Sequence, residues 1–183
     1  EGVTPDLMAI SKGLTGGYMP LAATLTTEAI YRAFLGRYDE WKTFFHGHSY
    51  TGNPLGCAVA LANLEIFARE GTLAQVRKKS RLLGRLLRPL ADLRHVGDIR
   101  QCGFMVGIEL VQDRQSKVPF PLERRIGHRV AQACRLRGLL LRPLGNVIAL
   151  VPPLSIKPHE LTKMVAILHS AIREATEPLT PFS

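Results

Sequence analysis

The pair Asn53-Pro54 constrains the fold of this chain more than any other feature, because it fixes the beginning of a long helix. Asparagine is favoured at the N-cap, and proline at the first helical position, since the N–H that proline lacks would have no helical partner there. Apolar residues then recur at helical spacing, and Gly71 predicts the end of the helix. A second helix follows, with leucines on one face and basic residues over 77–88. The middle of the chain is therefore expected to consist of two consecutive helices.

Shorter segments flank these helices and differ in kind on the two sides. Ahead of them, the apolar run at 6–11 predicts a short buried strand, the run at 21–26 predicts another strand, and a helix is predicted over 28–35. Behind them, the pattern predicts a strand, a helix, a hairpin and a last helix, over 103–111, 122–137, 139–151 and from Pro158 onward. The first part is typical of the end of an α/β sheet domain and the second of a small α+β domain.

Composition places the chain among ordinary globular proteins. Hydrophobic residues make up 46% and charged residues 21% of 183 residues, which excludes the disordered class. No apolar run reaches the roughly 18 residues that a membrane helix needs. The first residues show no signal-peptide pattern and no initial methionine, so we expect the chain to begin inside a longer protein. The three cysteines, Cys57, Cys102 and Cys134, are expected to be buried free thiols, in keeping with a reducing, cytoplasmic setting.

Lys12 is the first residue that can carry chemistry. It follows the strand predicted over 6–11 and precedes three glycines, which can adopt positive φ and let a ligand approach the backbone. In open α/β sheets, ligands bind at the carboxyl ends of strands. A lysine there can form a Schiff base with an aldehyde cofactor. An exposed lysine in a turn is the alternative, and the tripeptide Ser-Lys-Gly taken alone favours it.

The segment HGHSYTGNP over 46–54 is the second candidate. It combines hydroxyl groups and glycines with a helix N-terminus, where free backbone N–H groups and the helix dipole favour a phosphate. A capped helix after a polar loop is an equally good interpretation. His46 and His48 can suggest a metal, but no further Cys, His or Asp ligand pattern supports one.

Two basic features complete the candidates. Arg142 ends the strand segment 139–142, where a guanidinium can bind a substrate carboxylate through two parallel hydrogen bonds. Taken alone, a surface arginine on a hairpin is the favoured interpretation. The net charge of +9 and the basic stretch 77–88 can suit nucleic acid. No aromatic residues interleave with that stretch, so a solvated helix face is favoured, and neither nucleic acid nor membrane is expected as a partner.

Three segments taken together resemble the class III aminotransferases of pyridoxal-phosphate (PLP) fold type I. They are PDLMAISKGLTGGYMPLAATLTTE, FFHGHSYTGNPLGCAVALANLEIF and LLLRPLGNVIALVPPL, in that order, and the resemblance covers nearly the whole chain. It implies an α/β fold, namely the C-terminal part of a PLP-dependent transferase of fold type I. Residues 1–93 would be the end of the large PLP-binding α/β domain, and residues 94–183 the small C-terminal α+β domain.

The resemblance also implies a role for each candidate residue. Lys12 matches the lysine that holds pyridoxal 5'-phosphate as a Schiff base and then moves the substrate proton. His48 and Ser49 match the residues that contact the cofactor phosphate across a homodimer interface, and Gly47 matches a backbone contact to the substrate. Arg142 matches the arginine that binds the substrate carboxylate.

Within the family, GGYMPLAATLTTE and HGHSYTGNPLGCA resemble most closely the enzymes of biotin biosynthesis. This implies amino transfer to 8-amino-7-oxononanoate, giving 7,8-diaminononanoate. Members that use S-adenosylmethionine as donor usually have a tyrosine where this chain has Ala149, so lysine, the donor of some relatives, stays open. Another class III ω-aminotransferase is the alternative among enzymes, and a non-catalytic basic module that binds nucleic acid is the alternative outside them.

The N-terminal part of the family's chain has no counterpart in this sequence. That part carries a Gly-Ser phosphate loop, an aromatic residue that stacks on the cofactor ring, and an aspartate that pairs with the pyridine nitrogen. Without that aspartate the cofactor is a poor electron sink. We therefore expect the 183-residue chain alone to be inactive.

Overall fold

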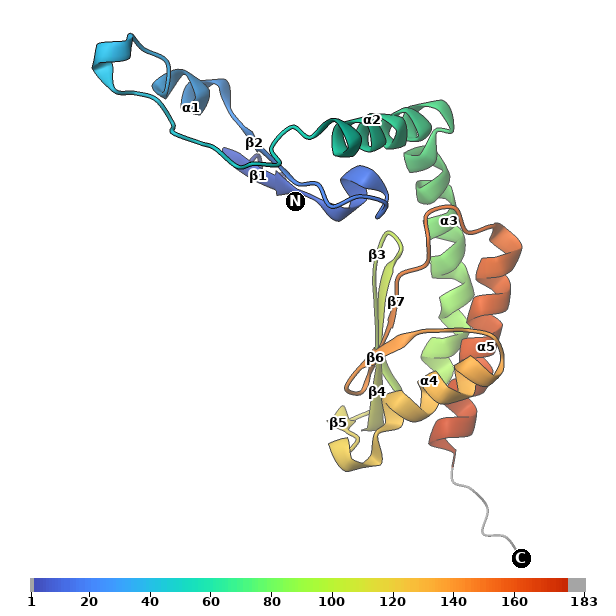
Figure 1. Cartoon of the computed structure of the whole chain (residues 1–183). Coiled ribbons are helices and arrows are strands. Elements are labelled where there is room, and N and C mark those ends of the chain that lie inside the picture. The colour runs from blue at the N-terminus through green and yellow to red at the C-terminus, as the bar shows by residue number, and fades with distance from the viewer. Residues whose placement is uncertain (1, 178–183) are drawn as a thin grey trace, which may run out of the picture. The chain divides into compact units, whose positions relative to one another are not determined.

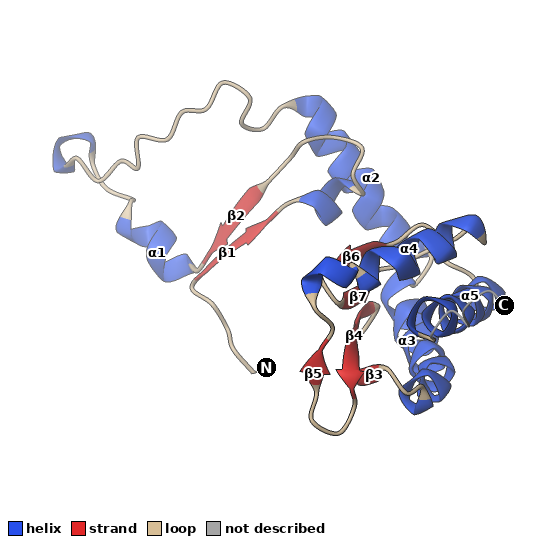
Figure 2. Ribbon diagram, turned by 90° about the horizontal axis from the view of Figure 1, so that it is seen from below, coloured by secondary structure: helices blue, strands red, loops and turns tan. Residues whose placement is uncertain are grey.

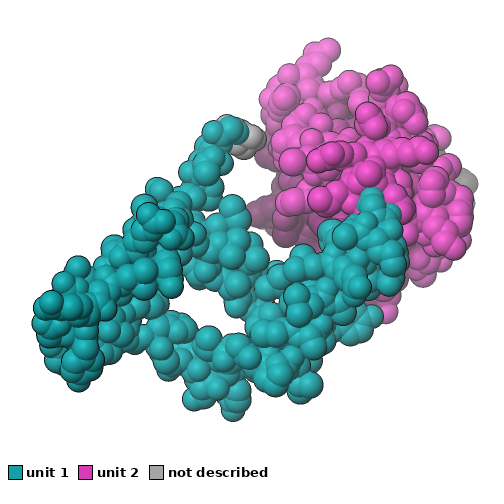
Figure 3. All heavy atoms as spheres, turned by 90° about the horizontal axis from the view of Figure 1, so that it is seen from above, with its two compact units in different colours: residues 1–71 teal, residues 72–183 magenta. Residues whose placement is uncertain are grey.

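The computed structural model describes residues 2–177 and divides the chain into two compact units, residues 1–71 and 72–183 (Figure 3). The sequence pattern puts the start of the second domain at residue 94, later than this division. Helix α3 (Thr72–Leu87) accounts for the difference. Its residues Leu83 and Leu87 are buried in the core of the second unit, so the helix belongs to that unit in packing terms.

The first unit begins with an antiparallel pair of strands. Strands β1 (Leu7–Ile10) and β2 (Ala23–Thr26) confirm both strands expected there, and they pair in register from Leu7 opposite Thr26 to Ile10 opposite Ala23. The burial expected for the first strand is wrong, because most residues of β1 are exposed, as are most residues of β2. A sheet of only two strands offers little apolar surface for a core.

Two helices and two short 3-10 turns complete the first unit. The helices are α1 (Glu28–Ala33) and α2 (Pro54–Arg69), and the turns are η1 (Lys12–Thr15) and η2 (Tyr38–Glu40). The start of α2 confirms the prediction from the Asn53-Pro54 pair. Asn53 is the N-cap, and its Oδ1 accepts a hydrogen bond from the Gly56 N–H at 2.7 Å. Such a cap stabilises a helix by about 1 kcal/mol.

The second unit is one antiparallel sheet covered by helices. Its strands run in the order β3 (Val96–Cys102), β4 (Met105–Asp113), β7 (Val147–Leu150) and β6 (Arg142–Leu144), and β5 (Val118–Pro119) pairs with the far end of β4. Helices α3, α4 (Ile126–Leu136) and α5 (Pro158–Thr176) lie on one face of this sheet (Figures 1 and 2). Two 3-10 turns, η3 (Arg88–Asp92) and η4 (Leu122–Arg124), link the elements.

The core of the second unit lies between that sheet and its helices. Residues Ile108 and Leu110 of β4 and Ile148 of β7 alternate toward the helices and are fully buried. They meet Leu168 and Ile172 of α5, which belong to the apolar stripe that the sequence predicts for the last helix. Period-two alternation on the strands and 3.6-residue spacing on the helix thus produce one shared interior.

Strand β3 is an element that the sequence pattern did not predict. Its apolar residues are interrupted by Asp98 and Arg100, which lie on the face of the sheet that the helices leave uncovered. There Arg100 Nη1 forms ion pairs with Asp98 at 2.8 Å and with Glu109 of β4 at 3.1 Å. The strand is recognisable only once β4 lies beside it, because its charged residues find their partners across the sheet.

The other helices and strands expected in the second unit are present, and only their first and last residues differ from the expected ones. The helix expected over 122–137 is α4, preceded by η4, and the expected hairpin is β6 and β7 around Gly145, whose φ is 59°. The last helix begins at Pro158, as expected.

The sequence favours a solvated helix face for the basic stretch 77–88, and this interpretation is wrong for one of its residues. Lys79 is buried, and its Nζ donates hydrogen bonds to the carbonyl oxygens of Leu154 at 2.6 Å and Ile156 at 3.0 Å. A buried ammonium group needs such acceptors, because it has left water. Lys79 therefore fastens the loop before α5 to helix α3.

The cysteines differ from one another in burial, so the expectation of three buried thiols is wrong. Cys134 is buried, Cys57 is half-buried and Cys102 is exposed at the end of β3. Burial raises the pKa of the Cys134 thiol to about 11. Among residues 2–177, no helix combines the length and the apolar character needed to cross a membrane.

Candidate active site

Lys12 lies directly after strand β1, at the point where the chain turns into η1. Its φ of 36° is in the left-handed region, where a residue other than glycine pays about 1–3 kcal/mol. Gly16 and Gly17 follow with φ of 61° and 85°, so the glycines allow the tight turn that the sequence pattern suggests. Strained residues of this kind persist where surrounding contacts hold them, and they cluster at functional sites.

Two residues that the sequence analysis did not single out hold this turn. Thr15 is buried, and its Oγ1 donates to the carbonyl oxygen of Met19 at 2.6 Å. Asn63 of α2 donates from Nδ2 to the carbonyl oxygens of Gly13 at 2.8 Å and Leu14 at 3.1 Å. An asparagine within the mostly apolar sequence CAVALANLEIF is the signal that could have drawn attention to this bond. Helix α2 thus fixes the backbone that carries Lys12.

A hollow of about 600 Å³ lies beside Lys12. It is lined by residues 11–12 and 17–22, which are the end of β1 and the segment that leads into β2. Within residues 2–177, the Lys12 amine forms no hydrogen bond and no ion pair. The site therefore presents a free primary amine, on a rigid turn, next to open space.

The segment 46–52 forms an exposed loop ahead of α2. The rings of Phe44 and His46 are stacked with their centroids 5.6 Å apart, and His48 lies 4.6 Å from His46. Ser49 and Gly47 are exposed, and in the described part of the chain the Ser49 hydroxyl has no hydrogen-bond partner. Because the Asn53 side chain already occupies one N–H of the helix start, a phosphate here would rely on loop groups more than on the helix end.

This loop and Lys12 are not joined in the structure. No hydrogen bond or ring contact links His48 or Ser49 to Lys12 within residues 2–177. The same range holds no group of three or more His, Cys, Asp or Glu side chains that could bind a metal ion.

Arg142 lies on the uncovered face of the sheet in the second unit, in a row of directly paired residues. Arg142 is opposite Ala149, Ala149 is opposite Gly107, and Gly107 is opposite Arg100. Side chains opposite one another on neighbouring strands point to the same face. The hairpin register therefore explains why position 149, seven residues after the arginine, is its direct neighbour.

The two arginines of this row differ in their partners. Arg100 is held by Asp98 and Glu109, and these hydrogen bonds raise the pKa of its guanidinium. Arg142 has no hydrogen bond or ion pair with any described residue. Of the two, Arg142 is the cation available to an anionic ligand.

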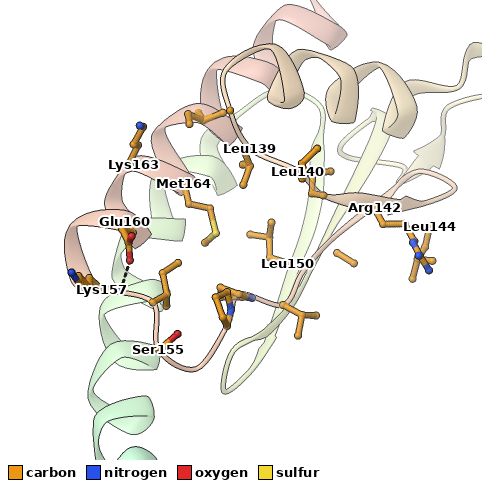
Figure 4. Close-up of a pocket in the computed structure, with 18 residues that line it drawn as sticks. Leu139, Leu140, Arg142, Leu144, Leu150, Ser155, Lys157, Glu160, Lys163 and Met164 are labelled. Carbon is orange, nitrogen blue, oxygen red and sulfur yellow. Dashed lines mark hydrogen bonds between the residues drawn. The ribbon is translucent and has the colours of Figure 1, made fainter. Parts of the chain in front are cut away.

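The surroundings of Arg142 are apolar. Leu144 lies two residues from Arg142 on the same face of β6, and Leu140 and Val151 lie two residues from Arg142 and Ala149, just outside the strands. Leu140, Leu144 and Val151 are 80%, 64% and 68% exposed. Figure 4 shows Arg142 and Leu144 together on β6, apart from the pocket centre where Leu139, Leu150 and Met164 converge. A lone guanidinium among aliphatic side chains suits a carboxylic acid with an apolar chain.

The fold and these residues define a class of protein. The chain belongs to the class-III aminotransferases, because the family model described as "Aminotransferase class-III" matches residues 1–172. This confirms the family and the fold that the three sequence segments suggest.

Individual relatives and solved structures are similar to this chain to different degrees. The chain is 54% identical over 177 residues to the adenosylmethionine-8-amino-7-oxononanoate aminotransferase of Anoxybacillus flavithermus, covering 97% of this chain and 39% of that relative. The crystal structure of the enzyme of the same name from Methanocaldococcus jannaschii is 51% identical, with a TM-score of 0.87, over 93% of this chain and 39% of that one. The PMP-bound aminotransferase from Vibrio fluvialis is 30% identical, with a TM-score of 0.86, over 94% and 38%.

The chain thus spans about 39% of the length of the curated relatives that it matches. Class-III aminotransferases are PLP-dependent enzymes. The residues present fit that cofactor, since Lys12 offers an unpaired amine beside a hollow and Ser49 offers an unpaired hydroxyl.

Proposed function

We propose that the protein is an aminotransferase of biotin biosynthesis, which converts 8-amino-7-oxononanoate to 7,8-diaminononanoate. The observation that carries this proposal is the unpaired Lys12 amine on its strained turn, in a chain whose similar relatives carry that enzyme's name. Lys12 would hold PLP, and its Nζ would then move the proton of the substrate carbon that exchanges its amino group. When bound, PLP supplies the sink for the electrons that remain on that carbon.

We assign the substrate carboxylate to Arg142. Its free guanidinium and the exposed leucines beside it match an acid with a long aliphatic chain, which is the chemistry of 8-amino-7-oxononanoate. Gly47 is assigned to a backbone contact with the same substrate. The expected donor is S-adenosylmethionine, as the relatives' name states, although Ala149 stands beside Arg142 where a tyrosine is usual.

The experiment combines labelling with kinetics on the intact protein, meaning the longer protein in which this chain is expected to lie. Borohydride reduction followed by peptide mass mapping should place a pyridoxyl group on Lys12. Arg142→Met should raise KM for 8-amino-7-oxononanoate about 10- to 100-fold, because a charge-assisted hydrogen bond contributes about 1.5–3 kcal/mol. Arg135→Met, at an exposed arginine without an ion pair, is the matched control and should leave KM unchanged.

Either of two results would overturn this assignment. A protein that takes no label after PLP is added has no cofactor lysine at position 12. A labelled protein that ignores 8-amino-7-oxononanoate but transfers amino groups between other amines would be a different class III ω-aminotransferase. Assays with S-adenosylmethionine and with lysine as the amino donor then show which donor an enzyme with alanine at position 149 uses.

We further propose a homodimer with shared active sites. His48 and Ser49 make no contact with Lys12 of their own chain, which suits a phosphate site completed by a second copy. The test mixes Lys12→Ala chains with His48→Ala/Ser49→Ala chains, both inactive alone. In a symmetric dimer with sites shared across the interface, random mixing should restore about a quarter of the activity. Activity that stays at the level of the separate variants would contradict shared sites.

A further inference from the structure

A second pocket in the 72–183 unit is lined by basic residues that the proposed reaction does not use. It has a volume of about 540 Å³, within the range of about 300–1,000 Å³ that small-molecule sites occupy. Three arginines line it, from the turn before β3, from η4 and from α4: Arg94, Arg124 and Arg129.

None of the three guanidinium groups forms a hydrogen bond or an ion pair in the part of the chain that the structure describes, either with a carboxylate or with residues 175–177 at the end of α5, which also line the pocket. Arg94 interacts with Asp113 only through its charge, which is the smallest of the effects that lower the pKa of that carboxyl group. Arginines that merely neutralised the end of that helix would be expected to donate such bonds.

The two carboxylates in the pocket wall are engaged elsewhere. Asp113 accepts hydrogen bonds from the Ser116 N–H at 2.7 Å and from the Ser116 hydroxyl at 2.5 Å, which lower its pKa. Glu177 accepts from Arg173 Nε at 2.9 Å. Glu177 is neutralised by Arg173, and the single charge of Asp113 faces three arginines, so the pocket keeps an excess of positive charge.

One neighbouring feature favours an anion in the same place. Helix α4 begins at Ile126, which lines the pocket, and it has neither a side-chain cap nor an acidic residue in its first turn. His95 also lines the pocket, and its Nδ1 donates to the Val111 carbonyl oxygen at 3.0 Å, which fixes the ring as part of the wall.

The pocket is separate from the proposed substrate residue of the same unit. The row that contains Arg142 crosses β4 at Gly107, whereas the pocket is lined by Gln112 and Asp113 at the other end of that strand. A separation of six residues along a strand corresponds to roughly 20 Å. A ligand here would therefore not contact Arg142.

We infer that this pocket binds a small, multiply charged phosphate-type anion, such as a pyrophosphate or a phosphorylated metabolite. Guanidinium groups suit phosphate because their planar donors form paired hydrogen bonds with its oxygens. Three such groups and a helix N-terminus form a site for more than one phosphate oxygen.

The test measures binding of inorganic pyrophosphate to the intact protein by isothermal titration calorimetry at low ionic strength, where such attraction is strongest. The protein is first saturated with PLP, so that the phosphate site proposed at His48 and Ser49 is filled. We expect saturable binding of one pyrophosphate per chain. Arg94→Gln/Arg129→Gln should weaken it by at least about tenfold.

A matched control carries the same loss of charge outside the pocket. Arg85→Gln/Arg135→Gln replaces two exposed arginines and should bind pyrophosphate as the parent does. If the pocket variant does not fold, judged by circular dichroism, Arg124→Gln at an exposed position of η4 replaces it and should also weaken binding.

Three outcomes would overturn the inference. They are the absence of saturable binding, an equal loss in the control, and a DNA duplex that binds more tightly than pyrophosphate and displaces it. An equal loss in the control would mean that net charge alone explains pyrophosphate binding. Tighter binding of DNA would mean that this face binds nucleic acid. Each can be told apart from a failure of the proposed enzyme activity, because none of the readouts is catalytic.

Discussion

Single residues in this chain matter through bonds that span large distances in sequence. Lys79 shows this most clearly, because its Nζ holds two carbonyl oxygens of the loop before α5 and lies 5.9 Å above the Phe104 ring. That loop also lines the pocket near Arg142. One ammonium group thus connects helix α3 to the segment that follows β7.

Replacing Lys79 should therefore destabilise the second unit. In Lys79→Met the aliphatic stem stays, but the carbonyl oxygens of Leu154 and Ile156 lose their donor, at a cost of about 1–3 kcal/mol. Lys78→Met, at the exposed neighbouring lysine, should change the free energy of unfolding by less than about 0.5 kcal/mol. Urea denaturation of both variants measures the difference. Equal values would mean that the Lys79 bonds contribute nothing to stability.

At the scale of elements, the position of Arg142 depends on how closely α4 approaches the β6–β7 hairpin. Gly127 in the first turn of α4 allows this approach. A Cβ added there would lie 2.2 Å from the Gly145 carbonyl oxygen and 2.9 Å from the Pro143 Cβ. Both atoms belong to the turn that carries Arg142, so the absence of one methyl group sets the distance between helix and hairpin.

Gly127→Ala should consequently force α4 and the hairpin apart and destabilise the protein by about 1–3 kcal/mol. Gly84→Ala is the matched control within helix α3. Its added Cβ would meet only the exposed Gln101 amide, whose hydrogen bonds to Ser80 and Gly103 would be disturbed, and alanine gains about 1 kcal/mol of helix propensity over glycine, which offsets that loss. Thermal unfolding should therefore show a clear loss of stability in Gly127→Ala and little change in Gly84→Ala. A Gly127→Ala protein as stable as its parent would show that the β6–β7 hairpin can move away from α4 without loss of stability.

At the scale of the molecule, the two units differ in how much interior they possess. Among the described residues of the first unit, burial is confined to Thr15, Gly56 and Ala60. The second unit encloses an apolar cluster that runs from Leu83 to Ala175. A cooperative fold needs such a core to offset the entropy of ordering the chain.

The segment 72–183 produced alone should therefore unfold cooperatively, whereas the segment 1–71 alone should not. Circular dichroism during heating, together with the dispersion of amide signals in NMR spectra, measures both. A cooperative transition in 1–71 would show that its strands and α2 form a sufficient core by themselves. A second segment without a transition would show that its helices need the first unit.

The sequence by itself determined the features that depend on neighbouring residues. Asn53-Pro54 and Pro158 fix helix starts through local capping, and Gly145 fixes a hairpin through its positive φ. Lys12 was identified by its place between an apolar run and a glycine-rich turn. Together with the segment around His48, these local patterns were also sufficient to indicate the family.

Only the tertiary structure decided what depends on residues far apart in the chain. The bond of Asn63 to the Lys12 turn, the burial of Lys79 and the existence of β3 all rest on partners many residues away. The same holds for charge, since Arg100 is paired and Arg142 is free, and nothing in the residues next to either arginine indicates this difference. The physical reason is that burial and ion pairing are set by which strands and helices meet, and sequence periodicity does not specify those meetings.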